Sequence, residues 1–212
     1  MKSKNPKIAI INTGASNLRS VKYACDINNL DSSVVDENEN IENYQGLIVP
    51  GVGNFGYVMN RLKSNYLDKF ILNFIGSSKP AIFICLGMQL LFERSEEKKG
   101  INGLKIISGE VKKIKSGNKI LKIPVIGWNK INIKKKSDFF KNVNKEDFYF
   151  VHSYYVLPKN EEIVHSSTNY NGFNYCSSID YENIFACQFH PEKSGSAGLE
   201  IYKNFYEKCI EK

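Results

Sequence analysis

Three side chains in this sequence have the types and settings that nucleophilic acyl transfer requires: Cys85, His190 and Glu192. Cys85 follows the apolar run at 81–84, and the residues at 86–94 have helical composition. A sharp turn from a strand into a helix lifts a nucleophile out of its sheet. His190 follows a second apolar run, and Glu192, two residues later, lies on the same side of an extended chain. This pattern indicates a cysteine nucleophile, an imidazole base and a carboxylate that orients the imidazole.

Each of these residues also has an ordinary structural interpretation. A cysteine after a strand is more often a small buried apolar residue, and a His-Pro-Glu string is compatible with a capped turn that carries a surface histidine. Of the other histidines, His152 is interpreted as structural or substrate-lining and His165 as an exposed strand residue. The five cysteines form no CxxC pair, so we expect mostly buried thiols and no metal site.

A glycine loop, PGVGNFG at 50–56, is the third chemical feature. It follows the apolar run at 46–50, and glycines at the carboxyl end of a strand let backbone N–H groups approach a ligand. The loop matches neither GxxxxGK[ST] nor GxGxxG, so it does not predict nucleotide binding, and we expect no cofactor.

The elements that must position these residues predict an α/β fold with a mixed, largely parallel central sheet flanked by helices. In the first half, short apolar runs alternate with amphipathic segments, which is typical of parallel strands joined by crossover helices. The strands are expected at 7–11, 33–35, 46–50 and 81–84, and the helices at 17–28 and 55–63.

The second half has a different pattern, because apolar and polar residues alternate as in antiparallel strands with one solvated face. These segments are 109–116, 127–135, 147–156 and 161–170. A further strand is expected at 184–189 and a closing helix at 197–210. No repeat, linker or low-complexity tract is present, so residues 1–212 are interpreted as one domain.

Composition excludes several classes of protein. The 212 residues are 42% hydrophobic and 24% charged, which is typical of globular proteins and not of disordered or fibrous ones. The net charge is +7, but only three of the 29 basic residues are arginines, and the longest dense run is the lysine triplet at 134–136, interpreted as a solvated loop. We therefore expect no nucleic-acid partner. The first apolar run is too short for a signal peptide or membrane span, which predicts a cytoplasmic protein.

Six motifs, in order and with compatible gaps along nearly the whole chain, resemble those of the class I, or triad, glutamine amidotransferases. Within this family the sequence is most similar to the glutaminase subunits of imidazole glycerol phosphate synthase. The motifs are SNLRSV at 16–21, PGVGNFG at 50–56, ICLGMQLL at 84–91, IPVIGWN at 123–129, YFVHSYY at 149–155 and QFHPEKS at 188–194.

The resemblance implies an activity and a role for each matched residue. Cys85 would attack the side-chain amide of glutamine and form a glutamyl thioester, His190 would pass a proton to the departing ammonia, and Glu192 would orient His190. The backbone N–H groups of Val52 and Leu86 would form the oxyanion hole. The remaining matched residues would hold the substrate or give the loop its freedom: Gly51, Gly53, Gln89, Ser153 and Tyr154.

The resemblance also implies a partner. Free ammonia in water would be protonated and lost, so the family passes it through a tunnel to a synthase subunit similar to a TIM-barrel cyclase. We expect a heterodimer with such a subunit. Trp128, the only tryptophan, lies beside a glycine in a polar stretch and is a candidate interface anchor, although a core position is nearly as compatible.

The chain departs from the family pattern at three places. Phe83 stands where the family has a glycine two residues before the nucleophile, and we expect its ring to point to the sheet face away from the site. The first loop has Asn12-Thr13-Gly14 instead of Asp-Tyr-Gly, and Val125 replaces the usual histidine of the IPxxGWN element.

These departures leave two alternatives to a glutaminase subunit for histidine biosynthesis. One is a paralogous glutaminase that supplies ammonia to a sugar-amidating enzyme of surface polysaccharide synthesis. The other is a non-catalytic binding subunit in which Phe83 closes the turn at Cys85.

Overall fold

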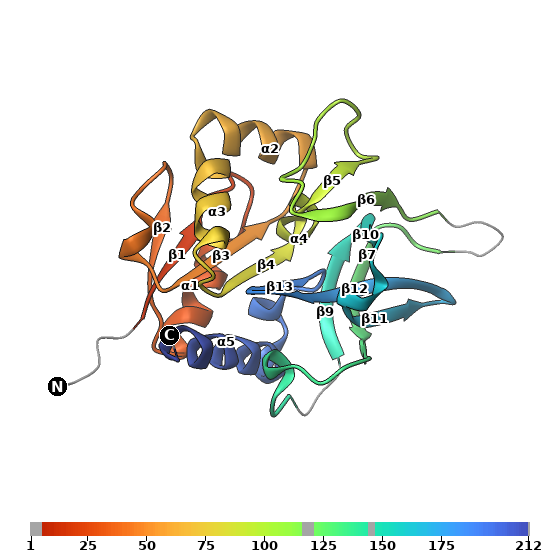
Figure 1. Ribbon diagram of the computed structural model, residues 1–212. Coiled ribbons are helices and arrows are strands. Elements are labelled where there is room, and N and C mark those ends of the chain that lie inside the picture. The colour runs from red at the N-terminus through yellow and green to blue at the C-terminus, as the bar shows by residue number, and fades with distance from the viewer. Residues whose placement is uncertain (1–5, 116–120, 144–146, 212) are drawn as a thin grey trace.

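A central sheet organises the fold in the computed structural model, which describes residues 6–115, 121–143 and 147–211. Within those residues the sheet has eight strands in the order β2-β1-β3-β4-β13-β12-β11-β8 (Figure 1). The strands are β1 (Lys7–Ile11), β2 (Asp31–Val35), β3 (Gly46–Gly51), β4 (Ala81–Cys85), β8 (Asn132–Ile133), β11 (Val164–Tyr170), β12 (Phe173–Tyr181) and β13 (Ile184–Cys187).

The sheet is mixed, as the sequence predicts. Strands β2, β1, β3, β4 and β13 pair in parallel, whereas β12, β11 and β8 continue the sheet in antiparallel pairs. The late strand β13 therefore returns to the parallel half and lies next to β4. Because parallel strands end at the same edge, this pairing brings the end of β13 close to the ends of β3 and β4.

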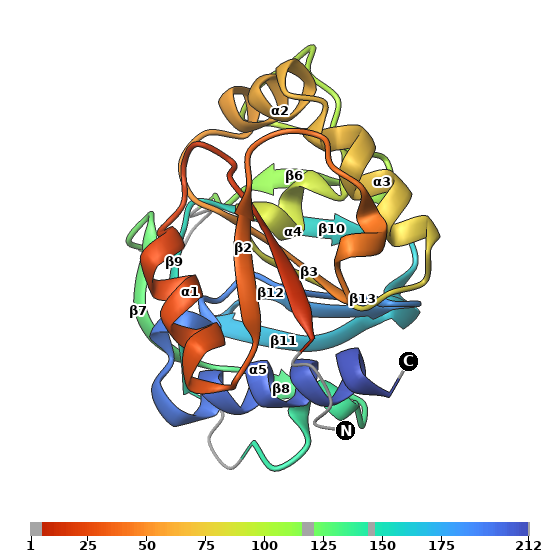
Figure 2. The ribbon, with the colours of Figure 1, turned by 90° about the vertical axis from the view of Figure 1, so that its left-hand side faces the viewer.

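Helices and two small sheets cover the two faces of the central sheet (Figures 1 and 2). One face carries α2 (Phe55–Ser64), α3 (Leu67–Gly76), α4 (Leu86–Leu90) and a three-stranded sheet of β5 (Phe92–Ser95), β6 (Ile107–Lys113) and β10 (Tyr154–Pro158). The other face carries α1 (Leu18–Ile27), α5 (Gly195–Ile210) and the pair β7 (Val125–Lys130) and β9 (Asp147–His152). Four short 3-10 helices complete the described elements: η1 (Ile41–Asn43), η2 (Asp138–Phe140), η3 (Glu161–Ile163) and η4 (Pro191–Lys193).

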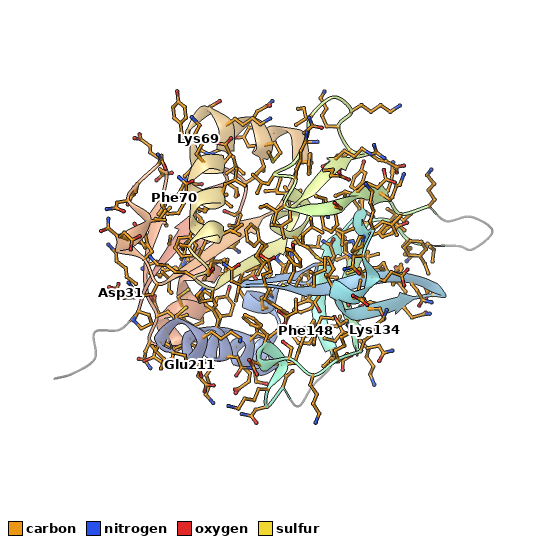
Figure 3. The ribbon with its side chains drawn as sticks, viewed as in Figure 1. Asp31, Lys69, Phe70, Lys134, Phe148 and Glu211 are labelled. Carbon is orange, nitrogen blue, oxygen red and sulfur yellow. The ribbon has the colours of Figure 1, made fainter. Side chains whose placement is uncertain are left out.

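Strand alternation divides the apolar residues into two cores. In β1, Ala9 and Ile11 join the core under α2 and α3, whereas Ile8 and Ile10 join the core under α1 and α5. Both faces of these parallel strands are buried, which explains their continuous apolar sequence. Figure 3 shows side chains filling both spaces, including Phe70 in the first core and Phe148 in the second.

Asparagine side chains begin the two helices that follow the site loops. The Asn17 side chain accepts a hydrogen bond from the Ser20 N–H at the start of α1, and that of Asn54 accepts from the Tyr57 N–H at the start of α2. Such caps satisfy backbone donors that have no partner inside the helix. Each loop therefore ends at a defined residue: the loop after β1 ends at Asn17, and the loop after β3 ends at Asn54.

Three elements differ from the sequence prediction. The helix expected through residue 94 ends at Leu90, because Phe92 turns into β5 and pairs with Ile107. Helix α3 was not predicted, although its buried face, with Leu67, Phe70 and Phe74, has helical spacing. Strand β12, which pairs with both β11 and β13, was not predicted either.

Two other sequence expectations concern the surface. The lysines at 134–136 are exposed in a loop, as predicted. Among the described residues, no helix has both the length and the apolar character that crossing a membrane requires. Residues 1–5 of the N-terminal segment, and residue 116 at the end of one predicted strand, lie outside the described residues.

Candidate active site

Cys85 lies at the strained junction between β4 and α4. It is the last residue of β4, caps α4, and has a φ of 54°, a backbone conformation that is uncommon for residues other than glycine. Gly87 makes the turn possible, because a Cβ atom there would lie 2.1 Å from the Val49 carbonyl oxygen. The side chain of Cys85 is thereby directed out of the sheet, as the strand-to-helix pattern predicts.

His190 and Glu192 form a buried pair immediately beyond β13. The Nδ1 atom of His190 lies 2.8 Å from the Glu192 carboxylate, and the two side chains are 2% and 3% exposed. The His190 backbone is also fixed, because its N–H donates to the Tyr149 carbonyl and its own carbonyl accepts from the Ser194 hydroxyl. The carboxylate accepts the Nδ1 proton, so it sets the tautomer and leaves Nε2 as the basic nitrogen.

The second ring nitrogen of His190 faces the nucleophile. Among the described residues, Nε2 is buried without a hydrogen-bond partner, and the imidazole is in electrostatic contact with the Cys85 sulfur. Burial by itself lowers the pKa of His190, but Cys85 and then Glu192 raise it more, so the pKa lies above its usual value. The arrangement therefore favours a protonated imidazole once Cys85 releases its proton.

A pocket of about 240 Å³ opens onto Cys85. It contains seven of the residues that the sequence predicts for the site, from three separate parts of the chain: Val52, Gly53, Cys85, Leu86, Gln89, Ser153 and Tyr154. Glu97, Pro124, Val151 and His152 complete its wall. Gly51 does not line the pocket; it pairs with Cys85 at the end of β3, where a Cβ atom would lie 3.0 Å from Leu86 and Gly87 atoms.

Two glutamine side chains connect the pocket wall to the sulfur. Gln89 donates from Nε2 to the Tyr154 carbonyl at 3.2 Å and to Oε1 of Gln188 at 3.1 Å. Gln188 in turn donates from Nε2 to the Cys85 sulfur at 3.5 Å. Sequence analysis assigned no role to Gln188, although it lies within the motif QFHPEKS, two residues before the predicted base.

Val52 differs from its predicted arrangement. Its backbone N–H donates to the Ala15 carbonyl at 2.8 Å, so it is not available to an oxyanion in this conformation. The oxyanion hole predicted from Val52 and Leu86 is therefore incomplete, because the glycine loop is hydrogen-bonded to the first loop. Gly53, with a φ of 87°, supplies the backbone freedom predicted for this segment.

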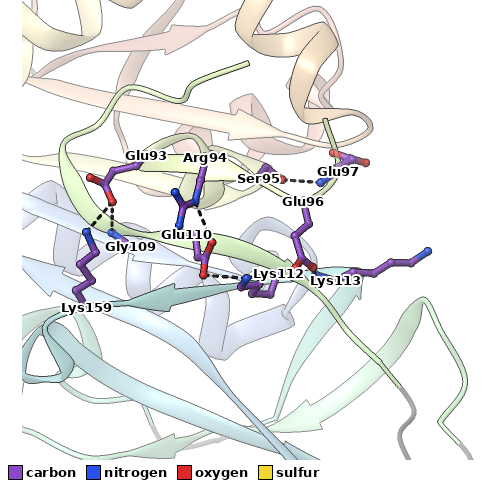
Figure 4. Close-up of polar contacts among 10 residues, drawn as sticks. All are labelled: Glu93, Arg94, Ser95, Glu96, Glu97, Gly109, Glu110, Lys112, Lys113 and Lys159. Carbon is purple, nitrogen blue, oxygen red and sulfur yellow. Dashed lines mark hydrogen bonds and ion pairs between the residues drawn. The ribbon is translucent and has the colours of Figure 1, made fainter. Parts of the chain in front are cut away.

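Glu97 reaches the pocket from the edge of the three-stranded sheet. One of its carboxylate oxygens accepts a hydrogen bond from the Phe55 N–H at 2.6 Å, and its own N–H donates to the Ser95 hydroxyl. Ion pairs on and directly beyond strands β5, β6 and β10 line this edge (Figure 4): Arg94–Glu110, Lys112–Glu110, Lys112–Glu96 and Lys159–Glu93. The hydrogen bonds of Glu97 itself, to Phe55 and Ser95, place it between the pocket and the start of α2.

The family of this chain follows from its similarity to known proteins. The family model for glutamine amidotransferase class-I matches residues 8–209. The chain belongs to the class I glutamine amidotransferase family. It is similar to imidazole glycerol phosphate synthase subunit HisH of Pyrococcus furiosus, with 42% identity over 94% of this chain and 97% of the relative. The corresponding HisH of Methanocaldococcus jannaschii is 44% identical over 94% of this chain and 98% of the relative.

Solved structures show the same fold at low sequence identity. A chain of PurLQS from Thermotoga maritima superposes with a TM-score of 0.70 at 17% identity, with 98% of both chains covered. A glutamine amidotransferase from the same organism gives a TM-score of 0.63 at 16% identity, covering 98% of this chain and 84% of that one. The mixed sheet and its helices are thus the architecture expected of a class I amidotransferase.

Phe83 leaves the amidotransferase site open. Its ring is fully buried in the core under α2 and α3, whereas Cys85 belongs to the opposite core and lines the pocket. The expectation that Phe83 points to the sheet face away from the site is confirmed. The ring does not close the turn, which removes the structural argument for a non-catalytic scaffold.

Trp128 lies on the surface. It is 57% exposed on β7, beside Ile126, which is 61% exposed, and its ring meets that of Tyr149 edge-on at 6.3 Å. The same strand follows directly after Pro124, a residue of the pocket wall. The core position weighed for Trp128 is therefore wrong, whereas its role as an interface anchor stays a prediction.

Of the other histidines, His152 lines the pocket, in agreement with its interpretation, but the prediction for His165 is wrong. His165 is 3% exposed, because β11 is an inner strand and the ring stacks on Phe140 at 5.3 Å. Over the described part of the chain, no group of three histidine, cysteine or acidic side chains is placed to hold a metal ion.

Proposed function

We propose that this chain hydrolyses the side-chain amide of glutamine to glutamate and ammonia, and that Cys85, His190 and Glu192 carry the reaction. The observation that supports this most strongly is that His190, oriented by Glu192 at 2.8 Å, is in electrostatic contact with the sulfur that lines the pocket. A cysteine, a base and an orienting carboxylate are the components that thioester formation requires.

The first half of the reaction releases ammonia. The proton of the Cys85 thiol moves to Nε2 of His190, and the sulfur attacks the carboxamide carbon of glutamine. The tetrahedral intermediate collapses when its C–N bond breaks and His190 returns the proton to the departing nitrogen, leaving a glutamyl thioester. Glu192 stabilises the imidazolium that exists between these steps.

The second half regenerates the cysteine. His190 removes a proton from water, the resulting hydroxide attacks the thioester carbonyl, and the C–S bond breaks to release glutamate. The sulfur leaves as thiolate and takes back the proton from His190. The reaction therefore consumes one water and needs no cofactor.

The oxyanion of both tetrahedral intermediates would accept hydrogen bonds from the N–H groups of Leu86 and Val52. For Val52 this role requires that its hydrogen bond to the Ala15 carbonyl is first broken. One oxyanion donor contributes about 3–4 kcal/mol of transition-state stabilisation. We therefore expect weak activity until the Val52 N–H exchanges its hydrogen bond to the Ala15 carbonyl for one to the substrate oxygen.

Substrate binding is assigned to the other residues of the pocket. Both Nε2 hydrogens of Gln89 are used inside the protein, so Gln89 would contact the amino acid end of glutamine through its carbonyl oxygen, which accepts from an ammonium group. The backbone of Ser153 and Tyr154 would complete this contact, and Gly51 and Gly53 would shape the loop above it. All but Gly51 line the pocket.

We further propose that the ammonia passes to a separate cyclase subunit with a TIM-barrel fold, in a heterodimer that forms imidazole glycerol phosphate synthase of histidine biosynthesis. The similar proteins from P. furiosus and M. jannaschii carry the name of this synthase, which supports it over a sugar-amidating enzyme. The exposed Ile126 and Trp128, on the strand that begins beside the pocket, form the face we assign to the cyclase. Both subunits would work in the cytoplasm.

Glutamine hydrolysis with and without a partner tests this proposal. We expect slow glutamate formation by the isolated chain and strong stimulation by the cyclase subunit of a related synthase together with its acceptor substrate. The Cys85→Ala variant should abolish glutamine-dependent synthesis while the complex still uses added ammonium salt. No complex and no stimulation would contradict the assignment to this synthase, and loss of the ammonium-dependent reaction would show that Cys85 serves assembly instead.

A further inference from the structure

Gln188 is fully buried and joined to the reacting sulfur. It follows β13 directly, and its backbone N–H donates to the Ser177 carbonyl of β12 at 2.9 Å, which fixes its position. Its side chain contacts Gln89 through Oε1 and the Cys85 sulfur through Nε2. A buried amide that is satisfied on both sides has one defined orientation.

The Tyr154 carbonyl sets the polarity of this chain of hydrogen bonds. A backbone carbonyl only accepts, so the atom of Gln89 that faces it must be Nε2. That nitrogen also faces Gln188, whose contact atom must therefore be the oxygen Oε1. The remaining end of the Gln188 amide, the NH₂ group, is then the end that meets the Cys85 sulfur.

His152 also fixes the Tyr154 carbonyl. Its Nδ1 lies 2.8 Å from the Tyr154 carbonyl and must be the protonated nitrogen, since that carbonyl only accepts. Its Nε2 then accepts from the Tyr175 hydroxyl at 3.2 Å. Two donors on one carbonyl hold it in place. Turning the Gln89 amide over would set its oxygen against the Tyr154 carbonyl, and turning the Gln188 amide over would set its NH₂ group against that of Gln89, so neither amide can reverse without losing a buried hydrogen bond.

The sulfur has two polar contacts of opposite effect besides His190. The Val151 carbonyl, 3.8 Å away, accepts from the thiol S–H and favours the neutral form. The Gln188 N–H, at 3.5 Å, donates to the sulfur and favours the thiolate, because hydrogen bonds to ions are stronger than those to neutral groups. When the thiol proton moves to His190, the hydrogen bond to the Val151 carbonyl is lost and the hydrogen bond from Gln188 becomes stronger.

We infer that Gln188 stabilises the Cys85 thiolate by N–H donation, and that Gln89 positions it by fixing its amide orientation from the Tyr154 carbonyl. The inference rests on the proposed role of Cys85 as nucleophile. It separates two sets of donors: Gln188 serves the sulfur, whereas the N–H groups of the oxyanion hole serve the substrate oxygen. When the thiol loses its proton, the electron pair of the S–H bond stays on the sulfur. The Gln188 N–H stabilises that charge until the sulfur bonds to the carboxamide carbon.

Other titratable groups lie around the Cys85 site. His190 and Glu192 come from the segment after β13, Cys187 from β13 itself, and His152 from β9 through its contact with His190. Glu97 enters the same pocket from the loop after β5. A test of Gln188 must leave these five unchanged, so that any altered pH dependence belongs to the amide.

The rate of Cys85 alkylation by iodoacetamide as a function of pH measures thiolate stability without glutamine. Peptide mass spectrometry separates Cys85 from the other four cysteines, all of which are buried. In Gln188→Met, which keeps a side chain of similar length but has no donor, we expect the midpoint of the alkylation profile to rise by about one pH unit. Gln45→Met removes an exposed amide far from the site and should leave the profile unchanged.

Kinetics add a second signature. Because Gln188 touches the sulfur and is not assigned to the substrate, kcat for glutamine should fall by about tenfold with KM unchanged. A folded Gln188→Met, by circular dichroism, with the wild-type midpoint would overturn the inference. If this variant does not fold, Gln89→Met decides: we expect a smaller upward shift, and a wild-type midpoint overturns the inference.

The two proposals fail in distinguishable ways. If the wild-type chain shows no glutamine hydrolysis with any cyclase, the proposed function fails, but the alkylation midpoint still reports on Gln188. If hydrolysis occurs and the midpoint does not move, only the role of Gln188 fails.

Discussion

At the scale of single residues, the chemistry depends on a histidine whose charge is controlled by its neighbours. Replacing Glu192 by Gln removes the carboxylate that holds Nδ1 of His190 and helps to raise its pKa. We expect kcat for glutamine hydrolysis to fall about 10²- to 10⁴-fold, because the imidazolium loses its counter-ion and the tautomer is no longer fixed. Steady-state glutaminase assays with the partner present measure this.

The matched control is Glu37→Gln, which changes an exposed carboxylate in a loop. It should leave kcat within a factor of two of wild type. Equal activity of Glu192→Gln and wild type would show that Glu192 does not act through His190.

A second residue-scale prediction concerns acid stability. Burial lowers the pKa of His152 to about 4, whereas the pKa of a histidine in the unfolded chain is about 6.5. The unfolded chain therefore binds a proton that the folded protein refuses, so the contribution of His152 to stability is present above about pH 6.5 and is lost as pH falls toward 4. Between pH 7 and pH 5 the free energy of unfolding should lose about 2 kcal/mol through this residue.

Urea unfolding of wild type and His152→Gln at both pH values isolates the effect. The stability difference between the two proteins should shrink by that amount at the lower pH, because glutamine does not titrate. A pH-independent difference would mean that His152 is not held neutral in the folded state.

The triad could be predicted from the sequence because its signals are local: a strand runs into Cys85, and His190 and Glu192 are two residues apart. The hydrogen-bonded route from Tyr154 through Gln89 to Gln188 could not. It joins positions that are 65 and 99 residues apart, and its polarity follows from which atom faces a carbonyl in space.

At the scale of elements, the turn between β4 and α4 controls where the sulfur points. Gly87→Ala would place a methyl group 2.1 Å from the Val49 carbonyl oxygen, which belongs to the rigid strand β3. We expect the free energy of unfolding to fall by about 2–3 kcal/mol, together with loss of activity.

Gly76→Ala is its control. Gly76 is the last residue of α3, and a Cβ atom there meets nothing within 4 Å. This substitution should be neutral or stabilise by up to about 1 kcal/mol, because alanine has the higher helix propensity. Equal stability of both variants in chemical denaturation would contradict the close approach of α4 to β3.

Strand prediction succeeded for the buried parallel strands and failed for others for a physical reason. Strands β1, β3 and β4 are buried on both faces, so their sequences are continuous apolar runs. Strand β12 contains Ser177 and Ser178, which are fully buried but bonded to Ser166 of β11, so its apolar pattern is interrupted. The early end of α4 depends on pairing between β5 and β6, which is a tertiary contact.

At the scale of the whole molecule, the candidate catalytic residues lie at one edge of the central sheet, and the strand pair β7 and β9 carries exposed apolar side chains. Trp128→Ala should leave folding and the isolated chain's Cys85 alkylation unchanged, because its ring is exposed on β7. It should weaken cyclase binding at least about 30-fold, as expected for an aromatic anchor. Isothermal titration calorimetry with the cyclase subunit measures this.

Tyr23→Ala provides the comparison, since Tyr23 is 65% exposed on α1 and lies outside the proposed interface. Its affinity for the cyclase should equal that of wild type. If both variants bind equally well, the partner docks on another face of the molecule.

The central claim is that Cys85 is the nucleophile of a glutamine site, and covalent labelling tests it most directly. Intact-mass and peptide mass spectrometry would follow the reaction of the chain with a diazoketone analogue of glutamine. We predict a single adduct, located on Cys85, that excess glutamine prevents and that Cys85→Ala does not form. Labelling of a different cysteine, or labelling of Cys85 that glutamine does not slow, would contradict the account.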